Sequence, residues 1–235
     1  MRRSSNAAVL APGGAVVPDV NTRKQQLVRE IIWEAATSLF AEKGYDETTV
    51  DEIAQAAGVS PRSCFRYFAS KSDIMAYSLV SFAEQLIAAI DACPRSWTMR
   101  EVFQKMMTQV TQDAVKHPRS QKVFEILKKW PEAGDAQSTR MADAQAMVSR
   151  AFEKRIPKSR ASSLAAGALG GLAIQITGVT VRWCIANGHC DVQAAVDEIL
   201  VTFDHLFLGT GGADRAEGHP KGVANNRGCR TGKVL

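Results

Sequence analysis

The sequence predicts an all-α protein of about nine helices, and three observations point to this fold class. Apolar residues recur every three or four positions along most of the chain, which is the period of an amphipathic helix. Glycine or proline stands between these periodic stretches, as expected where helices end. Serine or threonine precedes several of them, where its side chain can cap a first helical turn.

The composition is that of a soluble globular protein, with 46% hydrophobic and 23% charged residues in 235. The net charge of +5 favours a polyanionic partner only weakly, because much of the excess lies at the chain ends. The five cysteines are odd in number and lack Cys-x-x-Cys spacing, which argues for a reducing compartment and against a disulfide framework. The histidines also lack metal-ligand spacing, so we expect no metal and no cofactor. We see no apolar run long enough to span a bilayer, and we expect a cytoplasmic protein without a membrane partner.

The most informative stretch is 48–74, which predicts two short helices joined by a tight turn. Val50, Ile53 and Ala54 form one apolar stripe at helical spacing. Gly58 can end that helix in the left-handed conformation. Ser60 and Pro61 then suit the N-cap and the first position of the next helix.

The second of these helices divides into an apolar and a basic face. We expect Cys64, Phe65 and Phe68 to point into the core. From Gly58 to Lys71 the charged residues are all basic. A short basic helix presented by a second helix is the helix-turn-helix device for reading a DNA major groove.

Residues 29–74 resemble the N-terminal domain of the TetR family of bacterial transcriptional repressors. The resemblance implies a three-helix DNA-binding head on a helical body that binds a ligand and dimerises through its last two helices. It is carried by Ile31, Ile32, Ala35, Ala36, Leu39, Phe40, Ala41, Glu42, Lys43, Gly44, Tyr45, Thr49, Val50, Ile53, Ala54, Ala57, Gly58, Val59, Ser60, Phe65, Tyr67, Phe68, Ser70 and Lys71.

The expected organisation has four segments. Residues 1–21 and 209–235 are unpatterned and glycine-containing, and we expect a disordered N-terminal arm and a disordered C-terminal tail. Residues 22–70 form the predicted DNA-binding domain. Residues 71–208 form the predicted ligand-binding and dimerisation domain, with helices expected over 71–92, 98–116, 119–130, 136–155, 160–187 and 192–208. Pro131 and Gly134 are expected to mark a turn.

The candidate DNA contacts lie on the helix-turn-helix. Arg62 is the first choice for reading a guanine, because it lies near the N-terminus of the second helix. Arg66 suits a base or a phosphate, and Thr49 suits a phosphate or a purely structural cap. The full candidate set is Thr49, Ser60, Pro61, Arg62, Ser63, Arg66, Tyr67 and Lys71.

The body contains methionines and aromatic residues that suit either an adaptable apolar pocket or an ordinary core. Gln175 and Arg182 are stronger pointers to a ligand, because they are polar residues in an apolar helix. Trp33 in the first helix is either partly exposed or packed on the body. The candidate ligand contacts are Phe103, Met106, Met107, Phe124, Trp130, Met147, Gln175, Val179, Arg182 and Trp183.

The last two predicted helices carry the surface through which the resemblance implies dimerisation. In the last helix apolar residues alternate at four- and three-residue steps, which is a helix-packing seam. The candidate dimer-interface residues are Leu164, Ala168, Val192, Val196, Ile199, Phe203 and Leu206.

The helix-turn-helix and the resemblance together imply a sequence-specific transcriptional regulator. What the resemblance implies is a homodimeric repressor that binds a palindromic double-stranded DNA operator and releases it when an apolar or amphipathic small molecule binds the body. We find no nucleophile–base pair, paired carboxylates or phosphate loop, so we do not expect an enzyme. Two alternatives stay open: an activator of the same fold, and a small-molecule-binding or interaction protein whose head no longer binds DNA.

Overall fold

The computed structural model describes residues 9–10, 16–17, 20–188 and 191–208, which form ten helices and one pair of two-residue strands. The helices are α1 (Val20–Lys43), α2 (Val50–Ala56), α3 (Pro61–Tyr67), α4 (Lys71–Ala92), α5 (Met99–Lys116), α6 (Pro118–Lys129), α7 (Pro131–Ser138), α8 (Met141–Glu153), α9 (Ser162–Asn187) and α10 (Val192–Leu208). The strands β1 (Val9–Leu10) and β2 (Val16–Val17) pair antiparallel within the predicted N-terminal arm.

The all-α fold is confirmed, with one helix more than expected in the described part of the chain. The extra helix lies where a turn was predicted, because Pro131 is the first residue of α7 and Gly134 lies inside it. Proline is well tolerated at a first helical position, so it begins a helix here instead of breaking one. The predicted helix over 136–155 is consequently split near Thr139 and Arg140 into α7 and α8.

Residues 1–197 form one compact unit and residues 198–235 another. The predicted C-terminal tail, 209–235, lies outside the described residues. Of the second unit, the structure describes the end of α10. The predicted boundary at residue 70 separates a DNA-binding part from a ligand-binding part by function, and it stays a prediction.

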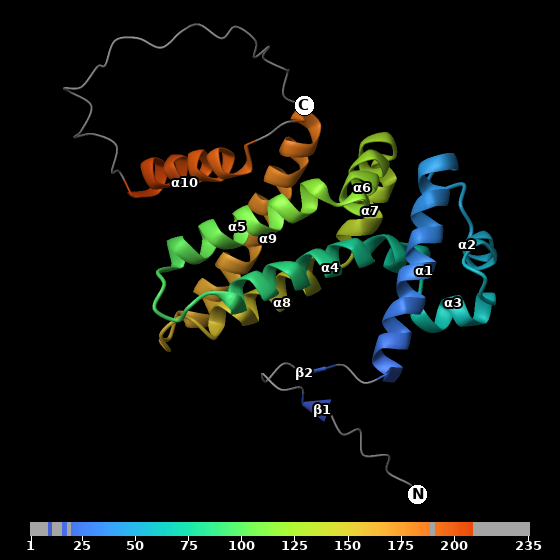
Figure 1. Cartoon of the computed structure of the whole chain (residues 1–235), viewed down its shortest axis with the longest axis horizontal. Coiled ribbons are helices and arrows are strands. Elements are labelled where there is room, and N and C mark those ends of the chain that lie inside the picture. The colour runs from blue at the N-terminus through green and yellow to red at the C-terminus, as the bar shows by residue number, and fades with distance from the viewer. Residues whose placement is uncertain (1–8, 11–15, 18–19, 189–190, 209–235) are drawn as a thin grey trace, which may run out of the picture. The chain divides into compact units, whose positions relative to one another are not determined.

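The helices α1, α2 and α3 lie together (Figure 1). They pack around one hydrophobic core. Ile32, Phe40, Ile53 and Cys64 are fully buried in it, and Phe68 nearly so. Their spacing along each helix puts them on one face, which is why these short helices fold together.

This core does not end with α3, because α6 and α7 contribute to it. Ile126, Ala133 and Ala136 are buried in the same cluster. The ring of Trp130 lies against Gly44, where a Cβ atom would stand only 3.2 Å from the ring. Gly44 has φ +101°, so the end of α1 combines a left-handed residue with a close aromatic contact.

Helix α4 runs from the α1–α3 group along α5, α7 and α8 (Figure 1). Phe103 of α5 stacks on Phe152 of α8 at 5.2 Å between ring centroids. Helices α8 and α9 approach closely at Gly170, where a Cβ would lie 2.8 Å from the backbone nitrogen of Ser149. Close helix packing therefore requires a glycine at Gly170 but not at Gly167, which has open space beside it.

By length and composition, α4 and α9 are each apolar enough to cross a bilayer, which corrects the expectation that no run is long enough. Core helices of globular domains meet the same criterion. Here 44% of the most apolar window of α4 and 39% of that of α9 are buried inside the protein. The buried share of each helix is accounted for by packing within the fold.

Candidate DNA-binding head and effector cavity

Helix α2 begins with a complete capping box. The Thr49 hydroxyl accepts a hydrogen bond from the backbone N–H of Glu52 (3.3 Å), and a Glu52 carboxylate oxygen accepts from the backbone N–H of Thr49 (2.8 Å). The other carboxylate oxygen binds Nζ of Lys43 at 2.5 Å. The Lys43 contact lowers the pKa of Glu52 to about 2, together with the Thr49 backbone N–H and the Thr49 hydroxyl, which donates to the same carboxylate at 2.8 Å. The start of α2 is thus fixed to the end of α1.

The turn between α2 and α3 follows the predicted pattern. Gly58 has φ +65°, and the backbone N–H of Val59 donates to the carbonyl of Ala54 (2.9 Å). Ser60 is the N-cap of α3, because its hydroxyl accepts from the backbone N–H of Ser63 at 3.1 Å. Pro61 occupies the first helical position. These contacts hold α3 rigidly against α2.

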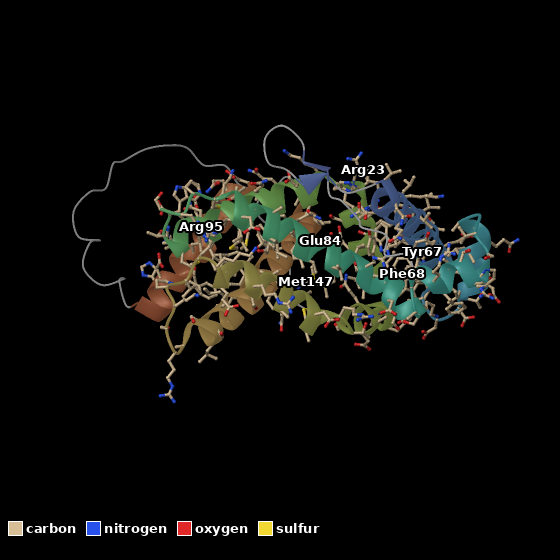
Figure 2. The ribbon with its side chains drawn as sticks, turned by 90° about the horizontal axis from the view of Figure 1, so that it is seen from below. Arg23, Tyr67, Phe68, Glu84, Arg95 and Met147 are labelled. Atoms are coloured by element: carbon tan, nitrogen blue, oxygen red, sulfur yellow. The ribbon has the colours of Figure 1, made fainter. Side chains whose placement is uncertain are left out.

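Helix α3 has seven residues and one buried face, which Cys64 and Phe68 fill. Figure 2 shows Tyr67 and Phe68 at the end of α3 that leads into α4. Burial raises the pKa of the Cys64 thiol, so it stays protonated.

The expectation that Phe65 belongs to the core is wrong, because 52% of this residue is exposed. Cys64 and Phe68 are four residues apart and already occupy the inward direction, so Phe65 points about 100° away from Cys64. It stands on the outer face with Arg62 and Arg66, which are also exposed. Sequence patterning missed this, since a phenylalanine at helical spacing ordinarily indicates a core position.

The outer face of α3 is basic. The guanidinium of Arg66 lies 5.1 Å from the ring centroid of Tyr67, which is half-buried. Ser63 is also half-buried and its hydroxyl bonds to that of Ser60 at 3.0 Å. Of the α3 candidates, Pro61, Arg62 and Arg66 are thus exposed, and Ser63 and Tyr67 are half-buried.

Two of the other predicted DNA contacts already have structural partners. Nζ of Lys71 donates to the carbonyl oxygens of Tyr45 (2.7 Å) and Asp46 (3.1 Å) and lies 4.3 Å from the Tyr45 ring centroid. It ties the start of α4 to the loop after α1. The Thr49 hydroxyl takes part in the capping box. Both side chains hold the head together, and their phosphate roles stay predictions.

A cavity of about 420 Å³ lies among α1, α4, α5, α6, α7, α8 and α9. The apolar residues lining it are Trp33, Leu79, Phe82, Ala114, Val123, Phe124, Leu127, Met141, Ile174, Gly178, Val181 and Ile185. The polar residues are Tyr77, Ser78, Ser81, Gln85, Asp113, His117, Arg119, Ser120, Gln137, Gln175 and Arg182. An apolar interior with several polar groups is typical of small-molecule sites.

Only some of the predicted ligand contacts line this cavity. Phe124, Gln175 and Arg182 do, and within the described residues Arg182 has no acidic partner. The remaining candidates, Phe103, Met106, Met107, Trp130, Met147, Val179 and Trp183, do not line it.

The physical reasons for their positions differ. Met106 and Met107 are fully buried, and Phe103 is stacked on Phe152, so these three belong to the core. Val179 and Trp183 are each 54% exposed, because they lie one helical step away from the cavity-lining positions of α9. Their role in ligand binding is untested, and the structure places them outside the cavity.

Sequence patterning missed several aromatic and charged cavity residues. Trp33 is fully buried, which decides between the two alternatives in favour of packing on the body, and the Arg119 guanidinium lies 4.8 Å from its ring centroid. Tyr77 and Phe82 come from α4. The unusual tryptophan in α1 was the one signal in the sequence that could have located this wall.

The predicted dimer-interface residues are divided in the structure. Leu164 is 79% exposed and Ala168 is also exposed, whereas Val192 and Val196 are buried against their own chain. Ile199 and Phe203, in the second unit, are partly buried, and the side chain of Leu206 lies outside the described residues. On α9 the exposed apolar side chains form a stripe at steps of four and seven residues: Leu164, Ala168, Leu172, Val179 and Trp183.

The described residues hold no group of three or more potential metal ligands, and Cys64, Cys93 and Cys184 are buried. Cys190 and Cys229 lie outside the described residues.

A capped two-helix unit with a basic outer helix defines the class of helix-turn-helix proteins. Residues 32–77 match the family model described as bacterial regulatory proteins, tetR family. This part of the chain, from α1 to the start of α4, thus resembles regulators of the TetR family.

Known proteins with related sequences include two regulators. The chain is 36% identical over 77 residues to the HTH-type transcriptional regulator TcmR of Streptomyces glaucescens, covering 33% of this chain and 34% of TcmR. It is 37% identical over 73 residues to the HTH-type transcriptional repressor KstR2 of Mycobacterium tuberculosis, covering 31% of this chain and 34% of KstR2. The chain thus matches about a third of the length of these relatives.

A similar fold is found in the crystal structure of native NalD, described as the secondary repressor of the MexAB-OprM multidrug efflux pump in Pseudomonas aeruginosa. The match has a TM-score of 0.51 at 19% identity and covers 76% of this chain and 95% of NalD. At that identity the likeness concerns the fold.

Proposed function

We propose that this protein is a sequence-specific DNA-binding transcriptional regulator that acts as a homodimeric, ligand-released repressor. The observation that carries the proposal is the outer face of α3. It exposes Arg62 and Arg66 on a helix fixed by the Ser60 cap, and no acidic residue occurs from Gly58 to Lys71. The match of residues 32–77 to the tetR family model and the regulator and repressor names of the relatives support it.

In this proposal α3 enters the major groove. Arg62 lies in the first turn of α3 and donates to O6 and N7 of a guanine, the commonest specific contact in the major groove. Arg66 contacts a base or the neighbouring phosphate. Phe65, exposed between them, makes an apolar contact with a thymine methyl group.

The exposed stripe on α9 supports dimerisation. Five exposed apolar residues on one helix face are unusual for the surface of a monomer, and they suit pairing with the same face of a second copy. A two-fold dimer places two copies of α3 in successive major grooves. Half-sites would then lie roughly one helical turn apart, about 34–36 Å, in a near-palindromic operator.

The cavity supports regulation by a small molecule. Its volume of about 420 Å³ and its mainly apolar lining suit an apolar or amphipathic effector. It is lined by Trp33 of α1 and by residues of α4, so an occupant contacts the helices that carry the head. We expect occupation to weaken operator binding.

The test is selection of DNA by the purified full-length chain from a pool of genomic fragments at a stated salt concentration. Enrichment of one near-palindromic sequence, bound by two chains, is the expected result. Weak binding without sequence preference, lost as salt rises, would refute the operator-binding function. The recovered fragment then serves as the operator in later experiments.

A further inference from the structure

Helix α1 is held to α6 and α4 by a group of polar side chains that we call the α1 clamp: Glu30, Glu34, Tyr77, Arg119 and Lys122. The Arg119 guanidinium pairs with Glu30, and its Nε donates to Glu34 at 3.1 Å. The Tyr77 hydroxyl donates to Glu30 at 2.8 Å, and Nζ of Lys122 lies 3.4 Å from Glu34. Each of these contacts thus joins a side chain of α4 or α6 to the carboxylate of Glu30 or Glu34 on α1.

The position of Arg119 favours this arrangement. It is the second residue of α6, and its backbone N–H donates to Nδ1 of the N-cap His117 at 3.1 Å. Carboxylates near a helix N-terminus are stabilised by the helix dipole, and hydrogen bonds between charged groups are stronger than neutral ones. The guanidinium also stacks on Trp33. Arg119 therefore contacts Glu30, Trp33 and Glu34, which lie on one face of α1 because Trp33 and Glu34 follow Glu30 by three and four positions.

The clamp is also a wall of the cavity. Tyr77 and Arg119 line the cavity together with Trp33, whereas Glu30 and Glu34 do not. Tyr77 and Arg119 therefore face the cavity and also contact Glu30 of α1, so a molecule in the cavity can compete with that carboxylate for them.

We propose that the α1 clamp is the element through which cavity occupation and DNA binding affect each other, an inference that rests on the function proposed above. With the clamp closed, α1 is held in the position that presents α2 and α3 to DNA. An occupant that displaces Arg119 or Tyr77 from the α1 carboxylates opens it. Because coupling between two binding sites is reciprocal, DNA must weaken cavity binding by the same factor.

The test uses the fluorescent amphiphile 1-anilinonaphthalene-8-sulfonate as the cavity probe, because it does not require knowledge of the natural effector. Its dissociation constant is measured on the full chain with and without the selected operator. The test variant is Glu30→Gln with Glu34→Gln, which removes both charges that Arg119 pairs with and leaves every cavity-lining residue unchanged.

Lys154→Gln is the matched control. Lys154 pairs with Asp91 at 3.7 Å in the body, and neither residue lines the cavity. For the natural protein and this control, operator should weaken probe binding at least about 5-fold, the lower end of typical couplings. In the double variant the probe should bind DNA-free protein at least as tightly as it binds the natural protein, because the α1 carboxylate charges no longer compete for Arg119. The operator effect should fall below about 2-fold.

The outcomes separate the clamp from the proposed function. If operator weakens probe binding equally in the natural protein and in the double variant, the clamp is not the coupling element. If the natural protein binds operator but the probe does not bind, or binds regardless of DNA, the effector response and the clamp both fail. Tyr77→Phe, which removes the hydroxyl bound to Glu30 and keeps the ring, should give an intermediate operator effect. It provides the same test if the double variant does not fold.

Discussion

Replacing Gly44 by alanine tests how firmly α1 is joined to the body. Gly44 has φ +101°, and a Cβ there would meet the Trp130 ring at 3.2 Å. A left-handed conformation costs a non-glycine residue about 1–2 kcal/mol, and overpacking costs roughly 1–3 kcal/mol. The smaller conformational entropy of the unfolded alanine chain offsets about 0.4–1 kcal/mol. We therefore expect the free energy of unfolding to fall by about 2–4 kcal/mol.

Gly58→Ala is the matched control, because Gly58 also has a positive φ, +65°, but no atom within 4 Å of an added Cβ. It should lose only about 0.5–1 kcal/mol, from the backbone conformation reduced by the entropy offset. Both variants are compared with the natural protein by equilibrium urea unfolding, provided that the denaturant dependence is unchanged. Equal losses at the two glycines would show that the Trp130 contact contributes nothing and would refute the reasoning.

Three further predictions concern DNA binding, acid stability and association. Arg62→Ala should lose about 1–3 kcal/mol of discrimination at one base pair, measured by competition between operator variants, and unchanged preference would rule out base reading by Arg62. Because the pKa of Glu52 is lowered to about 2, its stabilisation is present above its unfolded pKa of about 4.3 and is lost as pH falls toward 2. The free energy of unfolding should therefore be higher for the natural protein than for Glu52→Gln above pH 4.3. Measured by urea unfolding at a series of pH values, this difference should shrink as pH falls toward 2. Val179→Asp places a charge on the exposed stripe of α9 and should shift the dimer to monomer in sedimentation, whereas exposed Arg95→Asp should not.

The helix-turn-helix could be predicted from sequence because its signals are local. Thr49, Gly58, Ser60 and Pro61 each act on residues within one helical turn, and the structure has the turn and both helices at the expected positions. The face of α3 was predicted less well. The exposure of Phe65 depends on which neighbours fill the small core of the head, and periodicity over seven residues does not decide that.

The cavity could be predicted only in part. Phe124, Gln175 and Arg182 were identified as unusual residues in the body, but the other wall comes from α1 and α4. Contacts such as Arg119 with Glu30 join residues 89 positions apart, so no local pattern indicates them. The break between α7 and α8 was missed for a related reason, since no glycine or proline marks Thr139 or Arg140.

The shared core of α1, α6 and α7 has a consequence for engineering. Exchange of sensor and reader parts between regulators is usually planned at the boundary between head and body. A chimera joined near residue 70 would leave the buried surface that receives Ile126 and Trp130 facing a foreign body. A transplantable reader from this protein must therefore carry α6 and α7 with it, although they lie far downstream in the sequence.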